Sequence, residues 1–159
     1  MVEWRVTVTG LDEAISALWM FPDEVDKGLF TVMSEGERLG LQTMRQLAPT
    51  RSGFLVSRMY SYMPDRFTVG LVSGAPYSLF VEEATKAHWI PKGGVPGPKM
   101  LRFRGTKGKW AGKWVFQRVI WHPGTRAQPF IRPAARRVLE YVPRRFMELM
   151  KAFLRAVGF

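Results

Sequence analysis

Three prolines and a glycine fall within residues 122–134, and they constrain the path of the chain more than any other stretch. Each proline fixes the backbone dihedral φ and removes a hydrogen-bond donor, so the stretch predicts a stiff, irregular connection between two regularly patterned regions. The last proline can occupy the first turn of a following helix. Two large apolar side chains should tuck beneath the connection and attach it to a core. We call residues 122–134 the proline joint; its structural residues are Pro129, Phe130, Ile131 and Pro133.

Two long helices are predicted on either side of the chain's middle. Residues 134–157 carry a wide apolar face at helical spacing, although Pro143 should kink this helix or split it in two. An earlier helix should run from Pro22, with acidic residues in its first turn, to about Ala48, where Pro49 ends it. Three glycines inside it each cost about 1 kcal/mol relative to alanine. Either another backbone packs closely against them or the helix bends there. The glycines are Gly28, Gly36 and Gly40.

Alternation of apolar and polar side chains predicts several strands. They are residues 2–9, 54–63 and 66–72, the last two joined through Pro64 and Asp65. A short helix is expected at residues 11–20, and residues 77–84 fit a helix and a strand equally well. This order predicts an α+β fold, in which an antiparallel β-sheet has helices packed on one face. We expect a single α+β domain over residues 1–159.

The composition is that of a globular protein, because 47% of the residues are hydrophobic and 13% are aromatic. There is no cysteine, which excludes disulfides and thiolate chemistry. The sequence contains no run of about 18 apolar residues, and its N-terminus has neither the basic nor the apolar region of a signal peptide. We therefore expect a soluble protein without a membrane partner.

The net charge of +11 is unevenly distributed. Residues 1–50 hold eight acidic and four basic residues, whereas residues 51–159 hold five acidic and twenty basic ones. No acidic residue occurs between Glu83 and Glu140. Such a basic region could bind nucleic acid, an acidic partner, or the acidic part of a second copy of the chain.

A long basic excursion is expected at about residues 86–121, with a hairpin whose second arm is residues 113–121 and with mobile Gly-rich turns. Cations and aromatic residues alternate there, including Trp114 and Phe116. Cations can contact phosphates and rings can stack on bases, but arginines and aromatics are also enriched in protein interfaces, so both interpretations stay open. The candidates for a subunit or partner interface, or for a DNA channel, are Lys86, Trp89, Lys92, Lys99, Arg102, Arg104, Lys107, Lys109, Trp110, Lys113 and Arg118.

Residues suited to catalysis are sparse. His88 and His122 are the only histidines, and neither has a carboxylate nearby in sequence to support a general base. The adjacent Glu82 and Glu83 should point in different directions, which favours a solvated or ion-paired edge over a metal site. The Gly-rich segments do not match a phosphate-binding loop. We expect no enzymatic activity, no metal and no cofactor.

Five short fragments, in order along nearly the whole chain, resemble the neck and tail-completion family of long-tailed bacteriophages, often described as minor tail components. Many relatives run almost directly from the fourth fragment to the fifth, whereas residues 87–121 intervene here. The fragments are G-L-D-E at residues 10–13, L-A-P at 47–49, T-R-S-G at 50–53, G-A-P-Y-S-L-F-V-E at 74–82 and G-T-R-A-Q-P-F-I-R-P-A at 124–134.

The resemblance implies a structural virion protein of the head-tail junction: a neck, tail-completion or tail-terminator protein. Family members form a ring, expected to have six subunits, around the DNA channel. The implied partners are further copies of the chain, neighbouring neck, tail-tube and head-completion proteins, and DNA through non-specific contact. The implied location is the virion, after assembly in the host cytoplasm. The alternative is a stand-alone basic nucleic-acid-binding protein.

Overall fold

The computed structural model describes residues 1–8, 22–50, 53–105 and 108–156. The helix expected at residues 11–20 lies outside the described residues. The chain divides into two compact units: unit 1 is Met1–Glu83 with Gln128–Phe159, and unit 2 is Ala84–Ala127. The boundary after residue 127 falls inside the proline joint, and the expected basic excursion lies wholly within unit 2.

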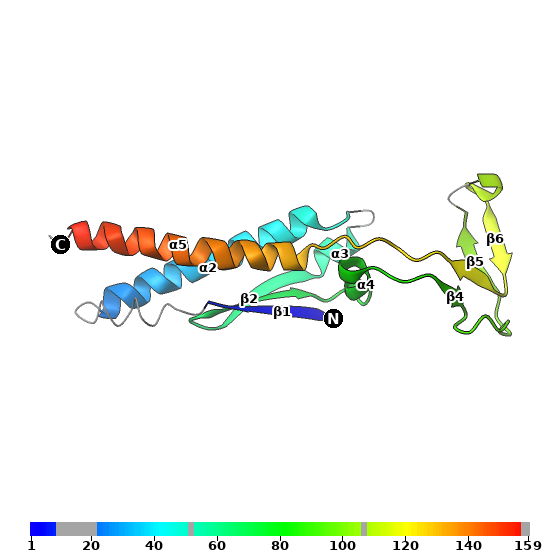
Figure 1. The fold of residues 1–159 in the computed structure, drawn as a ribbon, viewed down its shortest axis with the longest axis horizontal. Coiled ribbons are helices and arrows are strands. Elements are labelled where there is room, and N and C mark those ends of the chain that lie inside the picture. The colour runs from blue at the N-terminus through cyan, green and yellow to red at the C-terminus, as the bar shows by residue number, and fades with distance from the viewer. Residues whose placement is uncertain (9–21, 51–52, 106–107, 157–159) are drawn as a thin grey trace. The chain divides into compact units, whose positions relative to one another are not determined.

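Unit 1 contains a three-stranded antiparallel sheet (Figure 1). Its strands are β1 (Val2–Thr7), β2 (Met59–Asp65) and β3 (Thr68–Ser73), in the order β1-β3-β2. Every residue of the central strand β3 is buried. Tyr62 of β2 lies opposite Gly70 of β3, where a Cβ atom would come 2.3 Å from the tyrosine ring. The glycine therefore makes room for that ring.

Two long helices pack on the same side of this sheet (Figure 1). They are α2 (Pro22–Leu47) and α5 (Ile131–Ala156), and they run antiparallel to each other. A Cβ atom at Gly28 would lie 2.8 Å from the Leu149 side chain, and one at Gly36 would lie 2.7 Å from that of Val142. The helix α2 is continuous across its glycines. The groups that pack closely against Gly28 and Gly36 are side chains of α5, not another backbone as predicted.

The helix α5 continues through Pro143, so of the two effects predicted for this proline, a kink or a split, the split does not occur. Val142 and Phe146, on either side of the proline, are both fully buried. Packing of both flanks against the core keeps the helix continuous, although a proline in a helix interior removes one backbone hydrogen bond.

The start of the strand predicted at residues 54–63 was also wrong. The chain forms a single helical turn there, α3 (Phe54–Ser57), because Gly53 adopts a φ of 71° and turns the chain so that Leu55 is buried. Strand β2 then extends through Pro64 and Asp65, which were expected to form the connection. The undecided segment 77–84 is helical, as α4 (Ser78–Glu83).

The proline joint is attached to the core of unit 1 as expected. Phe130 and Ile131 are both fully buried, and Pro133 lies in the first turn of α5. Of the residues that the structure describes, Phe130 and Phe146 have the largest fully buried side chains. The aromatic and branched side chains of the joint thus begin the buried face of α5.

Unit 2 consists of two antiparallel ribbons. Strand β4 (His88–Ile90) pairs with β7 (Ile120–His122), and β5 (Leu101–Arg104) pairs with β6 (Trp114–Gln117). A 3₁₀ turn, Gly108–Trp110, precedes β6. The expected second hairpin arm therefore corresponds to two strands with different partners. Among the described residues of unit 2, Val115 is the only buried apolar side chain.

A backbone bridge between Thr85 and Thr125 joins the two ends of unit 2. The two residues exchange N–H···O hydrogen bonds of 3.3 and 3.1 Å. Gly124 has a φ of 83°, and a Cβ atom there would lie 2.3 Å from the Thr85 carbonyl oxygen. Only glycine fits this position without displacing the backbone.

No helix in the described parts of the chain is long and apolar enough to cross a membrane.

Candidate functional site

One face of the β5–β6 ribbon carries a group of cations and rings. Strand pairing sets Arg102 opposite Phe116 and Arg104 opposite Trp114, so all four side chains emerge on one face. All four are exposed, and Trp114 and Phe116 keep 55% and 53% of their surface accessible. The opposite face bears Leu101, Phe103 and Val115, which are more covered. We call Arg102, Arg104, Trp114 and Phe116 the ribbon face.

Arginine side chains on the ribbon face are held by contacts other than carboxylates. The Arg102 guanidinium carbon lies 4.1 Å from the centre of the Trp114 ring, in a cation–π contact. Arg104 Nε donates a hydrogen bond to the Gly112 carbonyl oxygen at 3.2 Å. Both guanidinium groups therefore keep N–H groups without an acidic partner among the described residues. Such groups suit a phosphate or carboxylate from outside the chain.

In the β4–β7 ribbon, aromatic residues lie opposite residues of the same type. The rings of Trp89 and Trp121 meet edge to face with centres 5.0 Å apart, and those of His88 and His122 lie 5.3 Å apart. His122 Nδ1 accepts a hydrogen bond from the backbone N–H of Gly124. These contacts support the ribbon and the turn at its end.

The other predicted interface residues are distributed over the rest of unit 2. Lys109 lies over the ring of its neighbour Trp110, with Nζ 5.1 Å from the ring centre. Lys107 lies outside the described residues. The remaining exposed cations of the prediction are Lys86, Lys92, Lys99, Lys113 and Arg118. The structure gathers two of the predicted residues, Arg102 and Arg104, with two aromatic residues on one ribbon face, whereas the sequence predicted only an interleaved run.

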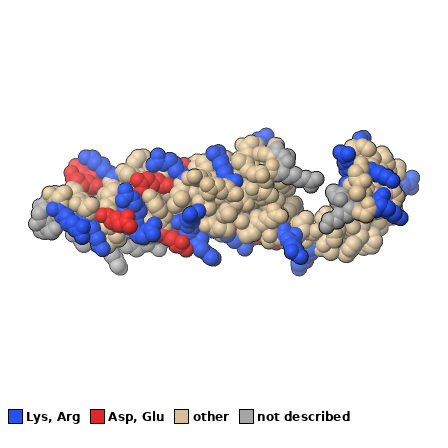
Figure 2. Space-filling model, turned by 90° about the horizontal axis from the view of Figure 1, so that it is seen from above, with Lys and Arg blue, Asp and Glu red and all other residues tan. Residues whose placement is uncertain are grey.

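Charge is divided between the two units. Unit 1 has fourteen Lys and Arg and thirteen Asp and Glu, whereas unit 2 has ten Lys and Arg and no acidic residue. Figure 2 shows red and blue side chains together on unit 1 and only blue ones on unit 2. Every ion pair among the described residues lies in unit 1. The excess positive charge of the protein is therefore almost entirely that of unit 2.

Sequence reasoning missed the role of Glu82. Its carboxylate is buried and accepts hydrogen bonds from the backbone N–H groups of Phe130 and Ile131 at 2.8 and 3.0 Å, and of Arg132 at 3.0 Å. These groups have no partner within the helix at the start of α5, so Glu82 caps that helix from α4. A solvated or ion-paired edge was expected for both glutamates; it holds for Glu83, which pairs with Arg132 at 2.6 Å, but not for Glu82. The local sequence carries no capping signal, because residue 82 and the helix start are 48 or more positions apart.

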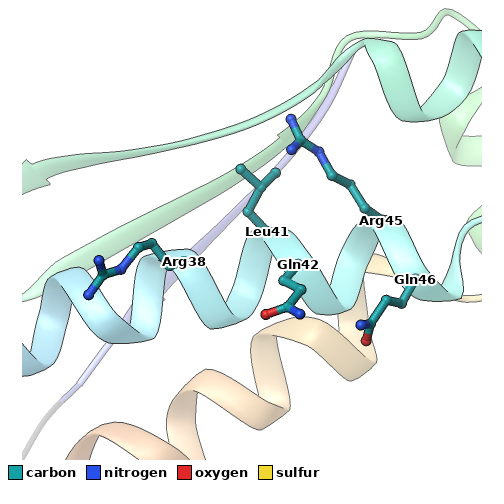
Figure 3. A pocket seen from close by; sticks show the side chains of 5 residues that line it. All are labelled: Arg38, Leu41, Gln42, Arg45 and Gln46. Atoms are coloured by element: carbon teal, nitrogen blue, oxygen red, sulfur yellow. The ribbon is translucent and has the colours of Figure 1, made fainter.

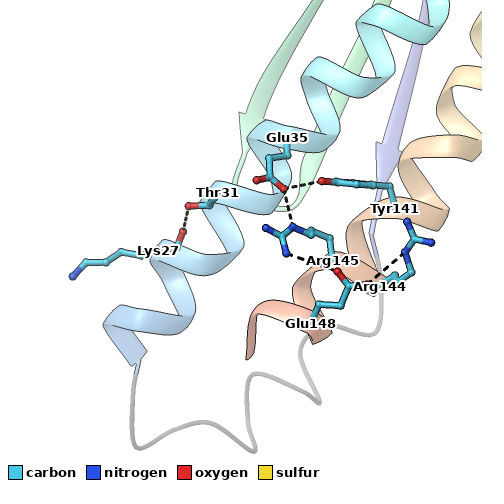
Figure 4. A network of polar contacts seen from close by, with 7 residues as sticks. All are labelled: Lys27, Thr31, Glu35, Tyr141, Arg144, Arg145 and Glu148. Atoms are coloured by element: carbon cyan, nitrogen blue, oxygen red, sulfur yellow. Dashed lines mark hydrogen bonds and ion pairs between the residues drawn. The ribbon is translucent and has the colours of Figure 1, made fainter. Parts of the chain in front are cut away.

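The two long helices are also joined by a polar network (Figure 4). Glu35 of α2 accepts hydrogen bonds from the Tyr141 hydroxyl at 2.8 Å and from Arg145 Nε at 3.3 Å, both on α5. The hydrogen bond from Tyr141, followed by that from Arg145, holds the pKa of Glu35 below its ordinary value, although partial burial opposes this. Burial and the bond to Glu35 raise the pKa of Tyr141. Part of the acidic charge of α2 is thus neutralised by α5 within the same unit.

A shallow hollow of about 340 Å³ lies along α2 and is lined by Arg38, Leu41, Gln42, Arg45 and Gln46 (Figure 3). Arg45 points toward β2 and donates a hydrogen bond to the Met59 carbonyl oxygen at 3.2 Å. Within the residues that the structure describes, no group of three or more His, Cys, Asp or Glu could hold a metal ion. The ribbon face is therefore the site with the most distinct chemistry.

Comparison of the chain with protein-family models, curated proteins and solved structures found no match.

Proposed function

We propose that the protein is a non-enzymatic structural component of a bacteriophage head-tail junction, acting as a neck, tail-completion or tail-terminator protein. In this proposal six copies form a ring that joins the tail to the head around the DNA channel. Unit 1 is the folded body of each subunit. Unit 2 contacts a partner, which is a neighbouring subunit, an adjacent neck or tail-tube protein, or the DNA.

The observation that carries this proposal is the composition of unit 2. It has ten cations, no acid, and a single buried apolar side chain among its described residues. Six of its large apolar side chains besides Trp114 are at least 45% exposed: Trp89, Val95, Met100, Trp110, Phe116 and Trp121. A unit of this size with so little core gains stability when a partner covers its surface. Such a surface fits a protein whose role is assembly.

Glu82 links two of the five fragments on which the proposal rests. The fourth fragment, residues 74–82, ends in this glutamate, and the fifth, residues 124–134, contains the three backbone N–H groups that it caps. Two of the five fragments are therefore parts of one structural arrangement. A physical reason of this kind explains why both fragments would occur together in a family.

The ring is tested by native mass spectrometry and electron microscopy of the purified full chain over a range of concentrations, alone and with candidate neck or tail-tube proteins. The proposal predicts a closed oligomer in at least one of these mixtures. A strict monomer that binds none of the partner proteins would contradict it.

The alternative is a stand-alone nucleic-acid-binding protein, and the absence of acidic residues from unit 2 favours it. The two functions differ in the partner that binds the basic surface of unit 2, which is nucleic acid in the alternative and includes other phage structural proteins in the proposed function. Tight binding of nucleic acid by a monomer, without any oligomer or docking to phage structural proteins, would favour the alternative.

A further inference from the structure

We infer that the ribbon face of unit 2 is a binding site for single-stranded nucleic acid, in which Trp114 and Phe116 stack on unpaired bases and Arg102 and Arg104 contact phosphates. This inference goes beyond the proposed role at the junction, where the DNA in the channel is a duplex. It does not depend on ring formation.

The charge of unit 2 suits nucleic acid. Unit 2 contains no acidic residue that could neutralise its ten cations, so its natural partner is an anion with repeated charges. The arginines and rings of the ribbon face would suit a protein partner as well. The rest of unit 2 favours the polyanion, because six of its ten cations are lysines, which are depleted from protein interfaces. A phosphodiester chain supplies one charge for every nucleotide.

Both arginines of the ribbon face are already held in place. The Arg102 guanidinium carbon lies 4.1 Å from the centre of the Trp114 ring, a cation–π contact that uses no N–H group of the guanidinium as a hydrogen-bond donor. Arg104 is fixed by the Gly112 carbonyl oxygen. Orienting these groups in advance lowers the entropy lost on binding a phosphate, for which the planar guanidinium is well shaped.

The exposed rings of the ribbon face favour single strands over duplexes. Bases in a duplex are already stacked on one another, so a duplex offers phosphates to the arginines but no ring face to Trp114 or Phe116. Unpaired bases offer both. Residues two apart on a strand are separated by about 6.6–6.8 Å, so each strand of the ribbon places successive side chains along an extended path. Exposed rings beside cations on a sheet surface are the usual arrangement for binding single strands.

The test measures binding of the full chain to a fluorescent single-stranded oligothymidylate of about 15 nucleotides, and to a duplex of the same length, by fluorescence anisotropy. Single-stranded DNA should bind more tightly than duplex, with an affinity that falls steeply as salt rises. Phe116→Ala should weaken single-strand binding by about tenfold, since one stacking contact is lost, and should change duplex binding little.

The matched control is Phe80→Ala. Phe80 is a phenylalanine of unit 1 with 56% of its surface exposed, close to the 53% of Phe116, and its loss should leave binding unchanged. Arg102→Ala should weaken single-strand binding more than Arg126→Ala, which removes the same charge from the same unit. Trp114→Ala should weaken single-strand binding, because a ring is lost. Trp114→Phe keeps a ring and should retain most of the affinity, which distinguishes loss of stacking from misfolding of the ribbon.

Three results would overturn the inference. They are the absence of single-strand binding at low salt, duplex binding as tight as single-strand binding, and equal effects of Phe116→Ala and Phe80→Ala. None of these results bears on whether the chain forms a ring, so failure of this site and failure of the proposed function can be told apart.

Discussion

Unit 1 and unit 2 belong to one chain but differ in what stabilises them. Unit 1 has almost balanced charge, a sheet covered by two long helices and a continuous buried core. Unit 2 has only positive charge, and its described residues include one buried apolar side chain. Burial of apolar surface is the main stabilising contribution to folding, so unit 1 should be stable alone and unit 2 should depend on its turns, its ring pairs and a partner. The functional surface is therefore expected in the part of the chain that has least core.

The largest effect should come from the core of unit 1. Phe130→Ala removes a fully buried ring and should lower the free energy of unfolding by about 3–5 kcal/mol. Thermal unfolding followed by circular dichroism measures the loss. The control is Phe116→Ala in unit 2, which should change it by about 0.5 kcal/mol or less because that ring is exposed. Equal effects of the two variants would remove the distinction between the units.

The cap of α5 should give the next largest effect. Glu82→Gln replaces a charged acceptor of three backbone hydrogen bonds with a neutral side chain that has one acceptor atom, which should cost about 2 kcal/mol in unfolding free energy. Chemical denaturation measures it. The neighbouring Glu83→Gln is the control: it breaks an exposed ion pair with Arg132, worth at most about 1 kcal/mol. A larger loss from Glu83→Gln than from Glu82→Gln would show that the buried cap has been misassigned.

A substitution at the base of unit 2 tests whether the units open separately. Gly124→Ala forces a Cβ atom against the Thr85 carbonyl oxygen at a φ of 83°, which should cost about 1–2 kcal/mol locally. Hydrogen exchange should become faster at the amides of Thr85 and Thr125, while the amides of α2 keep their protection. Faster exchange throughout α2 would mean that the two units unfold together.

The smallest predicted effect depends on pH. The pKa of Glu35 in the folded protein lies below its ordinary value of 4.5, so the bonds to Tyr141 and Arg145 stabilise the fold above about pH 4.5 and the stabilisation is lost as the pH falls through the folded pKa. Glu35→Gln should cost about 1 kcal/mol at pH 7, and this cost should shrink as the pH falls below about 4.5. Chemical denaturation over a series of pH values from 7 downward measures it. A cost that grows as the pH falls would contradict the assignment.

The sequence predicted the elements whose causes are local. Alternation identified β1, and the acidic first turn with a terminal proline identified α2. The α+β class and the burial of Phe130 and Ile131 followed from similar patterns. The missed features depend on residues far apart in sequence. Glu82 caps a helix that begins 49 residues later, and the packing on both sides of Pro143 comes from α2 and the core.

The composition of the candidate site was predicted, but the pairing of its strands was not. The basic and aromatic composition of residues 86–121 is visible in the sequence, and the alternation in L-R-F-R and W-V-F-Q is the signal that could have placed the two pairs on one face. The register that sets Arg102 opposite Phe116 is not visible, because it depends on how the intervening turn closes. The pairing of β4 with β7 was missed because it too depends on how the chain between the two strands folds.

Hydrogen exchange of the full chain, free and with single-stranded DNA at low salt, tests the difference between the two units most directly. We expect strong protection of α2, α5 and β3 in both samples. The amides of β5 and β6 should exchange rapidly in the free chain and slowly once the single strand is bound. Equal protection of both units in the free chain, with no change in β5 and β6 when DNA is added, would contradict this expectation.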